Sequence, residues 1–544
     1  MSDGYDLILI CQSNIVDYES YSHLPIEAID RYKTLVYPRM VRHDDRFVGH
    51  LDAINLSRHG GTYFDADYAT RRQRLNIWNM PSASGLHLAN ILSAHGIRTR
   101  IINNIDSEWD WFEEAYNRCS TPPLVGISST FYLGFKEVGR VARRLRAFDT
   151  DMEIVLGGAF TNSRALSGGA ESLERPMRKY GIDYVLHAFN SDTDLLALML
   201  ARKGGADLDQ VANLCRFDGG FAKGRFTASA SRWNPPMLDE VPANWDKVEA
   251  PYLNRTLQIR TASGCPFSCS FCSYPTTAGG WKTIEPERVR AHLDAVKRIP
   301  GIDRLIFIDD TFNVPKHRFK ELLEIFKDYD FEWFSFLRVQ YVDEDIVRAM
   351  KDSGCRGVYL GVESADDRVL ANMNKKARRE DFARGIELLN RFDITSLSAF
   401  VLGFPGETDA SIQANVDFIE NCGVDFYSLK EFFYMEHTDI HKKRDQYGLT
   451  GMGNRWSHDT MTSDRASDIK LEMFRSIKNA VSLDPDTSLW YLAYLYDQGY
   501  GVDGIKDMQR SINAISMDQM DGDMSSKTAA WDSLRVNAVR SAAG

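Results

Sequence analysis

The sequence predicts an α/β protein, because three observations along the chain agree. Strand-like and helical patterns alternate over residues 6–188, and the alternation resumes from residue 257 to residue 430. Beyond residue 433 the strand-like patterns stop and helical patterns remain. Strands and helices in alternation indicate parallel sheets covered by helices. We therefore expect three parts, residues 1–235, 236–432 and 433–544, of which the first two are α/β and the last is mostly helical.

The first part is predicted to form a doubly wound parallel sheet. Its expected strands are Asp6–Cys11, Thr99–Asn104, Leu124–Ser128, Glu153–Leu156 and Tyr184–Ala188. Helical patterns such as Ser84–His95 and Gly134–Phe148 lie between them. Ligands of such sheets bind beyond the carboxyl ends of the strands.

Two of these strand ends carry small residues. One strand ends in Ser128, Ser129 and a threonine, and the next ends in Gly157 and Gly158. Small hydroxyl residues and glycines let a large planar or phosphate-bearing ligand approach the backbone closely. The glycine pair fits a tight strand-to-helix turn equally well. Ser128, Ser129, Gly157 and Gly158 are therefore candidate ligand contacts.

A hairpin turn at Phe217–Gly220 and a proline-containing linker at Trp233–Pro242 separate the first part from the second. The strands expected after the linker are Leu257–Thr261, Arg304–Ile308, Trp333–Arg338, Gly357–Glu363, Ser396–Gly403 and Phe426–Lys430. The helices expected between them include Pro286–Arg298, Lys316–Tyr329, Asp343–Asp352 and Ala410–Asn421. Six such strands predict an incomplete parallel barrel, whose active site lies at the carboxyl ends of its strands.

The last part is expected to contain helices without strands. Asp468–Ser482 and Ser488–Tyr496 have helical patterns. Residues 517–544 are rich in Ala, Ser, Asp and Met, and this composition predicts a loosely ordered segment.

Composition and charge limit the classes of function. The 544 residues exceed what one core can organise, and 44% hydrophobic and 26% charged residues are typical of a soluble protein. The sequence shows neither an apolar stretch of about 20 residues nor a signal-peptide pattern. Five of the eight cysteines are scattered, which favours a reducing compartment, so we expect a cytoplasmic protein. A net charge of -11 without an extended basic stripe disfavours nucleic acid and favours a small molecule or a peptide as the substrate.

The most specific motif follows the first expected strand of the second part. Cys265, Cys269 and Cys272 have the spacing Cys-x3-Cys-x2-Cys on one short loop. Three thiolates can hold three irons of a [4Fe-4S] cluster and leave the fourth iron open to a ligand. A zinc site lacking its fourth ligand and a chance cluster of loop thiols are the alternatives. An open iron implies chemistry as well as electron transfer.

This loop, with the aromatic Phe271 before its last cysteine, resembles the signature of radical S-adenosylmethionine (SAM) enzymes. The strand ends Phe307–Phe312, Gly361–Ser364 and Gly403–Thr408 are similar to those of the same family. The first part resembles the cobalamin-binding domain of the cobalamin-dependent subgroup. The resemblance implies a Rossmann-like cobalamin-binding domain, a radical SAM partial (β/α)6 barrel and a mostly helical carboxyl-terminal region.

The resemblance also implies roles for individual residues. Cys265, Cys269 and Cys272 would bind the [4Fe-4S] cluster, whose open iron chelates the amino and carboxylate groups of SAM. Gly361, Glu363 and Gly403 are candidate SAM contacts, and Arg338 is a candidate partner for a carboxylate of SAM or of the substrate. Glu363 fits the cap of the following helix as an alternative. An ion pair between Arg338 and Glu363 is a further structural alternative.

One family motif is missing. Many cobalamin proteins carry Asp-x-His-x-x-Gly, whose histidine binds the lower face of cobalt, and this chain has no such motif. His59 and His87 have the wrong neighbours. No histidine from that motif should therefore occupy the lower face of a bound cobalamin. Such absences are usual in cobalamin-dependent radical SAM methylases, and a weakly held lower face is consistent with methyl transfer.

A finer resemblance concerns three further segments. Arg260–Gly264, Asp309–Pro315 and Trp456–Met461 look like those of the phosphinothricin P-methylases. Family members are expected to close the active site with the part of the chain that contains Trp456–Met461. An ordinary helix start capped by Ser457 or Asp459 is the alternative for that segment.

The resemblance implies a cobalamin-dependent radical SAM methyltransferase of antibiotic biosynthesis. It would methylate an unreactive P or C centre of a small natural-product intermediate, with a phosphinate as one candidate acceptor. Its cofactors would be a [4Fe-4S] cluster, SAM and cobalamin in the form of methylcobalamin. One SAM would methylate cobalamin, another would give a 5′-deoxyadenosyl radical, and an external donor such as flavodoxin or ferredoxin would supply electrons.

Three other functions remain open at this stage. A C-methylase of an indole or another amino-acid-derived substrate would use the same cofactors. So would a cyclase or ring-contracting enzyme that transfers no methyl group. A non-catalytic cofactor sensor would need a DNA-binding or partner-binding module, and the sequence shows no evident helix-turn-helix or basic surface for it.

Overall fold

The structure is a computed structural model that describes residues 4–14, 36–59, 74–132, 134–204, 207–234, 237–238, 255–485 and 488–540. The chain divides into two compact units. The first comprises Met1–Val16, Trp78–Phe267 and Ser273–Ile302, and the second comprises Asp17–Ile77, Ser268–Cys272 and Asp303–Gly544. Most of the expected linker, residues 239–242 included, lies outside the described residues.

The first unit contains a seven-stranded sheet in the order β4-β1-β5-β6-β7-β8-β9. Its strands are β1 (Leu7–Ile10), β4 (Thr99–Ile102), β5 (Leu124–Ser128), β6 (Ile154–Gly157), β7 (Tyr184–Leu186), β8 (Leu214–Asp218) and β9 (Arg225–Ala228). The first five of these in the chain are parallel, whereas β8 and β9 form an antiparallel hairpin. The doubly wound sheet and the hairpin are therefore as predicted.

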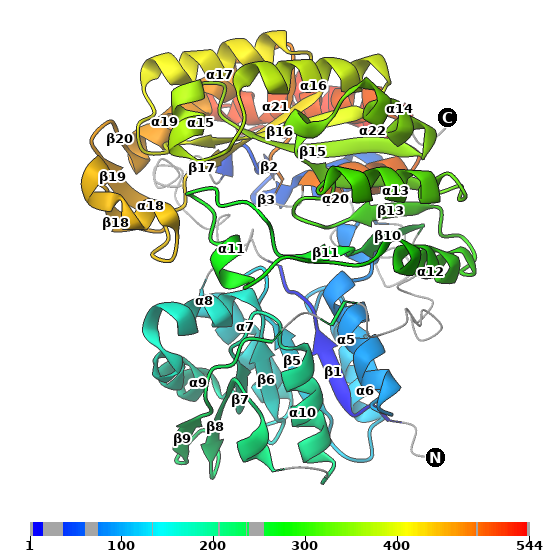
Figure 1. Cartoon of the computed structure of the whole chain (residues 1–544), viewed down its shortest axis with the longest axis vertical. Coiled ribbons are helices and arrows are strands. Elements are labelled where there is room, and N and C mark those ends of the chain that lie inside the picture. Colours follow the sequence, from blue (N-terminus) through cyan, green and yellow to red (C-terminus); the bar gives the residue numbers. More distant parts are fainter. Residues whose placement is uncertain are drawn as a thin grey trace. The chain divides into compact units, whose positions relative to one another are not determined.

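Helices cover both faces of this sheet (Figure 1). They are α5 (Ala83–Ala94), α6 (Trp109–Asn117), α7 (Phe135–Phe148), α8 (Ala159–Gly168), α9 (Glu174–Tyr180) and α10 (Asp192–Arg202). Alternate residues of a strand point to opposite faces. In β1, Ile8 and Ile10 accordingly join a core with the α6 and α7 side chains, while Leu7 and Leu9 join a second core with those of α5 and α10. A strand buried on both faces reads as a continuous apolar run, as residues 7–10 do.

The first unit also holds the segments around the cysteine loop. They are β10 (Thr256–Ile259), the short antiparallel pair β11 (Ala262–Ser263) and β12 (Lys282–Thr283), α11 (Tyr274–Thr277) and α12 (Pro286–Lys297). Gly264, which precedes the first cysteine, has φ +79°, and a Cβ there would lie 2.1 Å from the Gly280 carbonyl oxygen. The approach to the loop therefore requires glycine.

The second unit is built on parallel strands in the order β13-β14-β15-β16-β17-β21. Their bounds are β13 (Arg304–Phe307), β14 (Glu332–Leu337), β15 (Cys355–Glu363), β16 (Thr395–Leu402), β17 (Phe426–Glu431) and β21 (Val481–Ser482). The helices between them are α13 (Lys316–Phe326), α14 (Glu344–Asp352), α15 (Asp367–Asn372), α16 (Arg379–Arg391), α17 (Asp409–Asn421) and α19 (Ser463–Ser476). Figure 1 shows α16 and α17 together on one face of β15 and β16, as a parallel α/β barrel requires.

The carboxyl-terminal part is mostly helical, but the prediction that it has no strands is wrong. Besides β21, it contains a small antiparallel sheet of β18 (Thr450–Met452), β19 (Arg455–His458) and β20 (Met461–Thr462). The alternative that Ser457 or Asp459 caps a helix is also wrong, because α19 begins at Ser463 and Thr462 is its cap. Short strands between polar turns give too little periodicity to be recognised.

Two predictions near the end of the chain, the helix over residues 468–482 and the loosely ordered segment 517–544, also need correction within the described residues, which end at 540. The expected helix over Asp468–Ser482 begins earlier, and α19 ends at Ser476, because residues 481–482 pair with β17. Residues 517–540 are ordered rather than loose: α21 (Val502–Met520) runs into them and α22 (Ala529–Arg540) follows, with Trp531 buried. The other α-helices described in this part are the short α18 (Asp439–Lys442) and the longer α20 (Ser488–Asp497).

An amino-terminal segment packs on these last helices. The hairpin of β2 (Met40–His43) and β3 (Arg46–Gly49) contacts α21, and the next helix, α3 (His50–Arg58), contacts α21 and α22. Gln519 of α21 bonds both backbone groups of Arg42, accepting from its N–H at 3.1 Å and donating to its carbonyl at 3.0 Å. Residues 36–58 therefore belong to the second unit. No helix within the described ranges is both long and apolar enough to cross a bilayer.

Candidate functional site

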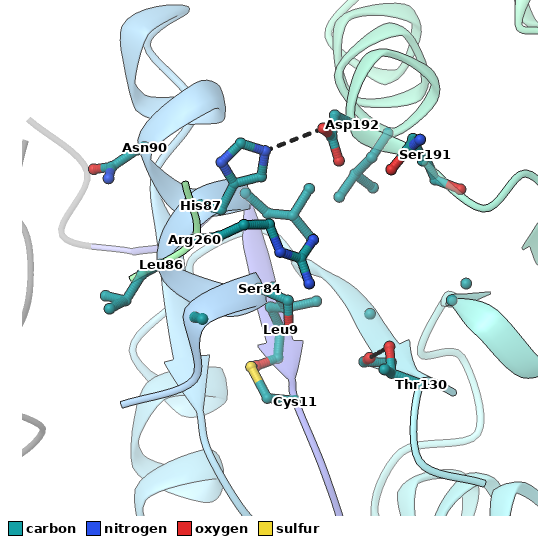
Figure 2. A pocket seen from close by; sticks show the side chains of 18 of the residues that line it. Leu9, Cys11, Ser84, Leu86, His87, Asn90, Thr130, Ser191, Asp192 and Arg260 are labelled. Atoms are coloured by element: carbon teal, nitrogen blue, oxygen red, sulfur yellow. Dashed lines mark hydrogen bonds and ion pairs between the residues drawn. The ribbon is translucent and has the colours of Figure 1, made fainter. Parts of the chain in front are cut away.

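A cavity of about 250 Å³ lies at the carboxyl ends of β1, β5 and β6 in the first unit. This is the edge of a doubly wound sheet where ligands bind. Its lining combines strand ends, the first turns of α5 and α10, and the segment that follows β10. Figure 2 shows these side chains around the open space. A cavity of this size can take part of a large cofactor.

The glycine pair at the end of β6 lines the cavity and also forms a tight turn. Gly157 and Gly158 both line the cavity, and Gly158 has φ +115° at the start of α8. A Cβ on Gly158 would lie 3.0 Å from the Thr130 backbone nitrogen and 3.1 Å from that of Ser129. The strand ends of β5 and β6 therefore approach each other closely only because this residue is glycine.

The serines at the end of β5 separate into two roles. Ser128 lines the cavity, and its hydroxyl lies 3.0 Å from that of Thr130, which lines it as well. Ser129 is fully buried outside the lining, where its N–H donates to the Gly157 carbonyl and its hydroxyl accepts from the Thr161 N–H. Ser129 thus supports the turn through hydrogen bonds, whereas Thr130 lies in the lining, where a ligand contact is expected.

A charged cluster enters the cavity from the opposite side. His87 of α5 contacts Asp192 of α10, with 3.0 Å between Nε2 and Oδ2. Burial would raise the pKa of Asp192, but the bond from His87 and the charges of His87 and Arg260 outweigh it, so that pKa is lowered. Figure 2 shows the Arg260 guanidinium beside His87 and directed toward the open space. The neighbours of His87 do not match the cobalamin motif, yet the fold places this histidine in the lining.

Part of the remaining wall is apolar. Leu9, Leu86 and Leu195 line it together with Cys11. Burial raises the pKa of the Cys11 thiol to about 12, which keeps it protonated at neutral pH. Cys11 therefore acts as a small apolar side chain.

In the second unit, Ser268–Cys272 is held by the loop that follows α15. The Ser270 N–H donates to the Met373 carbonyl and its hydroxyl to the Asn372 carbonyl, both at 2.8 Å. The Asn374 side-chain amide donates to the Ser268 carbonyl at 2.8 Å. The Ser270 carbonyl accepts from the Ile440 N–H at 2.9 Å, which adds α18 to the support. The loop is thus fixed through its backbone and through the Ser270 hydroxyl.

Positive charge lies beside one of these cysteines. Cys269 is buried, and its sulfur is 4.0 Å from Nη1 of Arg338. Arg338 also donates from Nη2 to the Lys375 carbonyl at 2.6 Å, and Asn313 bonds both of its backbone groups. The guanidinium thus places a positive charge beside a candidate iron ligand.

The donor set fits a [4Fe-4S] cluster, since three thiols lie within eight residues and none is in a disulfide. Cys265 and Cys272 are partly exposed. Within the described ranges, no group of three or more His, Cys, Asp or Glu side chains is arranged so that it could hold a metal ion. The assignment of the three ligands therefore rests on their spacing.

Glu363 forms an ion pair with Lys375, which is not among the predicted site residues. Its Oε1 lies 2.8 Å from Nζ of Lys375, and both side chains are largely buried. Gly361 makes room for this pair, because a Cβ there would lie 2.6 Å from the same Oε1 and 2.9 Å from the lysine Nζ. Both alternatives for Glu363 are wrong: Asp366 caps the next helix, and Arg338 is not its partner.

Gly403 lies in a turn enclosed by other side chains. It has φ +83°, and a Cβ there would lie 2.3 Å from the Trp456 ring. Its N–H donates to Glu407 at 2.6 Å, and its carbonyl lies 3.1 Å from Nε2 of His458. The segment Trp456–Met461 thus packs on the end of β16. Phe271 lies near the same turn, with its ring centroid 6.3 Å from that of Phe404.

Residues 259–419 match the family model of the radical SAM superfamily. The chain therefore contains a radical SAM domain, which spans β10 to α17 and includes the three cysteines. An uncharacterized methyltransferase of Pyrococcus horikoshii is 33% identical over 171 residues, which cover 31% of this chain and 37% of the relative. The bacteriochlorophyllide d C-12(1)-methyltransferase of Chlorobaculum tepidum is 26% identical over 204 residues, covering 35% and 44%. The chain thus spans less than half the length of these curated relatives.

A solved structure shares the fold over most of this chain. The radical S-adenosylmethionine methyltransferase TsrM from Kitasatospora setae, solved with cobalamin and a [4Fe-4S] cluster bound, superposes with a TM-score of 0.53. The match covers 81% of this chain and 78% of that one at 17% identity. The fold predicted for the radical SAM domain and for the domain before it is therefore confirmed.

Proposed function

We propose that this protein is a cobalamin-dependent radical SAM methyltransferase that acts on an unreactive phosphorus or carbon centre of a small natural-product intermediate. One observation carries the proposal: the chain that contains a radical SAM domain also has a cavity at the strand ends of a doubly wound sheet, next to Gly158. Two curated methyltransferases and the fold of TsrM support it.

Three cofactors follow from the proposal. The cluster with SAM would supply one-electron cleavage of a carbon–sulfur bond, and cobalamin would supply a transferable methyl group. Cys265, Cys269 and Cys272 would hold the cluster, and the Arg338 guanidinium would offset the negative charge of their thiolates. The lysine that pairs with Glu363 fixes this carboxylate at the end of β15, where it can accept a hydrogen bond from SAM.

The cavity of the first unit would hold part of cobalamin. Gly157 and Gly158 allow close approach to the backbone, and Ser128 offers a hydroxyl there. Arg260 and His87 present polar groups to the same space. A phosphinate is the acceptor that we propose first, and an external donor such as flavodoxin or ferredoxin would supply the electrons.

Anaerobic reconstitution with iron, sulfide, SAM, hydroxocobalamin and reduced flavodoxin as the electron donor tests the proposal. Incubation with a phosphinate and, separately, with tryptophan should yield S-adenosylhomocysteine and one product that is heavier by a methyl group. Mass spectrometry of both mixtures identifies the acceptor. Reductive SAM cleavage with a rearranged but unmethylated product would instead identify a cyclase, and absence of SAM cleavage would contradict an enzymatic role.

A further inference from the structure

The inner face of the barrel in the second unit can be identified from ring contacts and strand register. The Phe400 ring lies 6.3 Å from that of Phe418 on α17, so Phe400 faces the helix and its neighbours in β16, Ala399 and Val401, face the interior. The register pairs Val401 with Lys430. Lys430 of β17 therefore also points into the interior, near the carboxyl end of its strand, where barrel active sites lie.

Lys430 belongs to a charged cluster around one carboxylate. Its Nζ lies 2.6 Å from Oδ1 of Asp484, the second residue after β21. Nζ of Lys470, from α19, lies 2.7 Å from the other carboxylate oxygen, and Nε of Arg39 lies 3.8 Å from the same oxygen. Ser428 donates its hydroxyl to Oδ1 at 2.9 Å. All four groups belong to the second unit.

The two lysines differ in how deeply they are buried. The side chains of Asp484 and Lys470 are 2% and 1% exposed, whereas that of Lys430 is 31% exposed. Lys470 and Asp484 thus form an enclosed pair, and Lys430 is the member that solvent or a ligand can reach. The Ser428 hydroxyl and the Lys430 ammonium lie on the same face of β17, because they are two residues apart.

The cluster has more positive than negative charge. Burial alone would raise the pKa of Asp484, but Lys430, Lys470 and Arg39 outweigh it and hold that pKa well below its usual range. The Asp484 carboxylate is shared by the two lysines and Arg39. Burial lowers the pKa of Lys470, and Asp484 and Glu431 raise it in part. Glu431 also accepts a bond from Ser467 of α19. An anion bound next to the partly exposed Lys430 ammonium would add a charged hydrogen bond to a lysine that shares its counter-ion with Lys470.

Aromatic side chains line the same interior. The Tyr359 residue pairs in register with Leu397, which alternates with Ala399, so Tyr359 faces inward as well. Its ring centroid lies 5.2 Å from that of Phe336, which is 5.7 Å from that of Trp490. Asp484 is close enough to Tyr359 to act on its pKa, which burial, Glu363 and Asp484 all raise. The interior therefore offers an apolar wall beside the ammonium.

We propose that Lys430 binds an anionic oxygen group of the substrate, a carboxylate or a phosphorus oxyanion, while the apolar part of the substrate packs on Phe336, Tyr359 and Trp490. Asp484 and Lys470 are positioning residues: Asp484 holds the Lys430 ammonium in place, and Lys470 shares that carboxylate. This assignment rests on the proposed function and specifies the charge of its substrate. Both oxyanions would be recognised by the same ammonium, so the experiment includes one of each.

The test compares acids with their neutral methyl esters in the cluster-loaded, cobalamin-loaded protein. Equilibrium dialysis measures the binding of a phosphinate, an amino-acid carboxylate and both esters to the wild type and to Lys430→Gln. We expect the wild type to bind one of the acids more tightly than its ester. The substitution should weaken the binding of that acid alone, by about 10- to 100-fold, because a charged hydrogen bond is lost. Lys430→Arg should restore part of the preference.

Lys327→Gln is the matched control, because Lys327 caps the carboxyl end of α13 and pairs with Glu324 in solvent. It should bind acid and ester as the wild type does. An equal loss for acid and ester in Lys430→Gln, or an unchanged preference for the acid, would overturn the proposal. Since dialysis needs no turnover, a protein that discriminates acid from ester but forms no methylated product would contradict the proposed function and leave the role of Lys430 intact.

Discussion

At the scale of single residues, the thiols of this chain differ in their surroundings. Cys269 lies beside the Arg338 guanidinium, whereas burial raises the pKa of Cys422 to about 11. Of these two thiols, only Cys269 lies next to a cation that could offset the negative charge of an iron-bound thiolate. Burial likewise raises the pKa of Cys11 in the cavity wall.

Substitution of Cys269 by serine should therefore remove the cluster. We expect iron and sulfide per chain to fall to near zero after anaerobic reconstitution. The visible absorption of the cluster should disappear as well. Cys422→Ser is the matched control and should keep both. A Cys269→Ser protein with a full complement of iron would show that this thiol is not a ligand.

The partner of Glu363 gives a second residue-level prediction. Lys375→Met leaves the Glu363 carboxylate largely buried without its cation, so the carboxylate should reorient or become protonated. We expect the dissociation constant for SAM to rise by about tenfold or more, as after loss of a charged hydrogen bond. Lys376→Met, at the exposed neighbouring position, should bind SAM normally. Equilibrium dialysis with labelled SAM decides between them, and equal binding by both variants would argue against a SAM contact at Glu363.

At the scale of elements, the turns that follow β6 at Gly158 and β16 at Gly403 depend on glycine. Gly158→Ala places a Cβ against the backbone nitrogens at the end of β5, in a conformation with φ +115°. We expect cobalamin affinity, measured by titration of its visible absorption, to fall at least tenfold because the cavity wall must shift. Gly96→Ala has a similarly positive φ of +70° but no atom within 4 Å of the new Cβ. This control should cost some stability without changing cobalamin affinity, and parallel losses in both variants would refute the explanation.

The hairpin of β19 and β20 gives a second prediction at this scale. Trp456 is buried, donates from Nε1 to the Phe432 carbonyl at 2.7 Å and stacks on His458 with 5.2 Å between ring centroids. Trp456→Ala should lower the free energy of unfolding by about 3–5 kcal/mol, as for other large-to-small substitutions in a core. Urea denaturation measures this loss. A change below about 1 kcal/mol would mean that the hairpin does not support the turn at Gly403.

The sequence predicts elements with strong periodicity well and short or irregular ones poorly. The buried strand at residues 7–10 and the helix α7 were expected within a residue or two, because an apolar run and a 3.6-residue period are strong signals. The strand β20 has two residues, too few for any period. At the site, the cysteine spacing and the strand-end glycines are local signals. The pairings of Glu363 with Lys375 and of His87 with Asp192 join residues from different elements, and no local pattern encodes them.

At the scale of the whole molecule, one buried acid makes stability depend on pH. Burial raises the pKa of Glu407 from 4.5 to about 8, although its bonds from Gly403 and Asn415 lower it in part. The folded state thus keeps a proton that the unfolded state releases above pH 4.5. The contribution of this group to stability is complete below pH 4.5 and is lost as pH rises toward 8.

Glu407→Gln should flatten this dependence, because glutamine keeps an acceptor for the Gly403 N–H and has no proton to lose. Urea unfolding at several values between pH 5 and pH 8 compares the two proteins. Asp409→Asn, at an exposed position two residues away, is the control and should follow the wild type. A wild-type stability that rises over this interval more steeply than that of Glu407→Gln would contradict the raised pKa.

The packing of residues 36–58 on the last two helices has a consequence for biosynthesis. Arg42 and Gln519 are 477 positions apart. At a synthesis rate of about 5–20 residues per second, the partner of this segment leaves the ribosome roughly half a minute to a minute and a half later. During that interval the apolar side of α3, with Ala53, Ile54 and Leu56, has no helix to cover it. The second unit can therefore complete its fold only after α21 and α22 have left the ribosome, and a chaperone that shields α3 until then should raise the yield of folded protein.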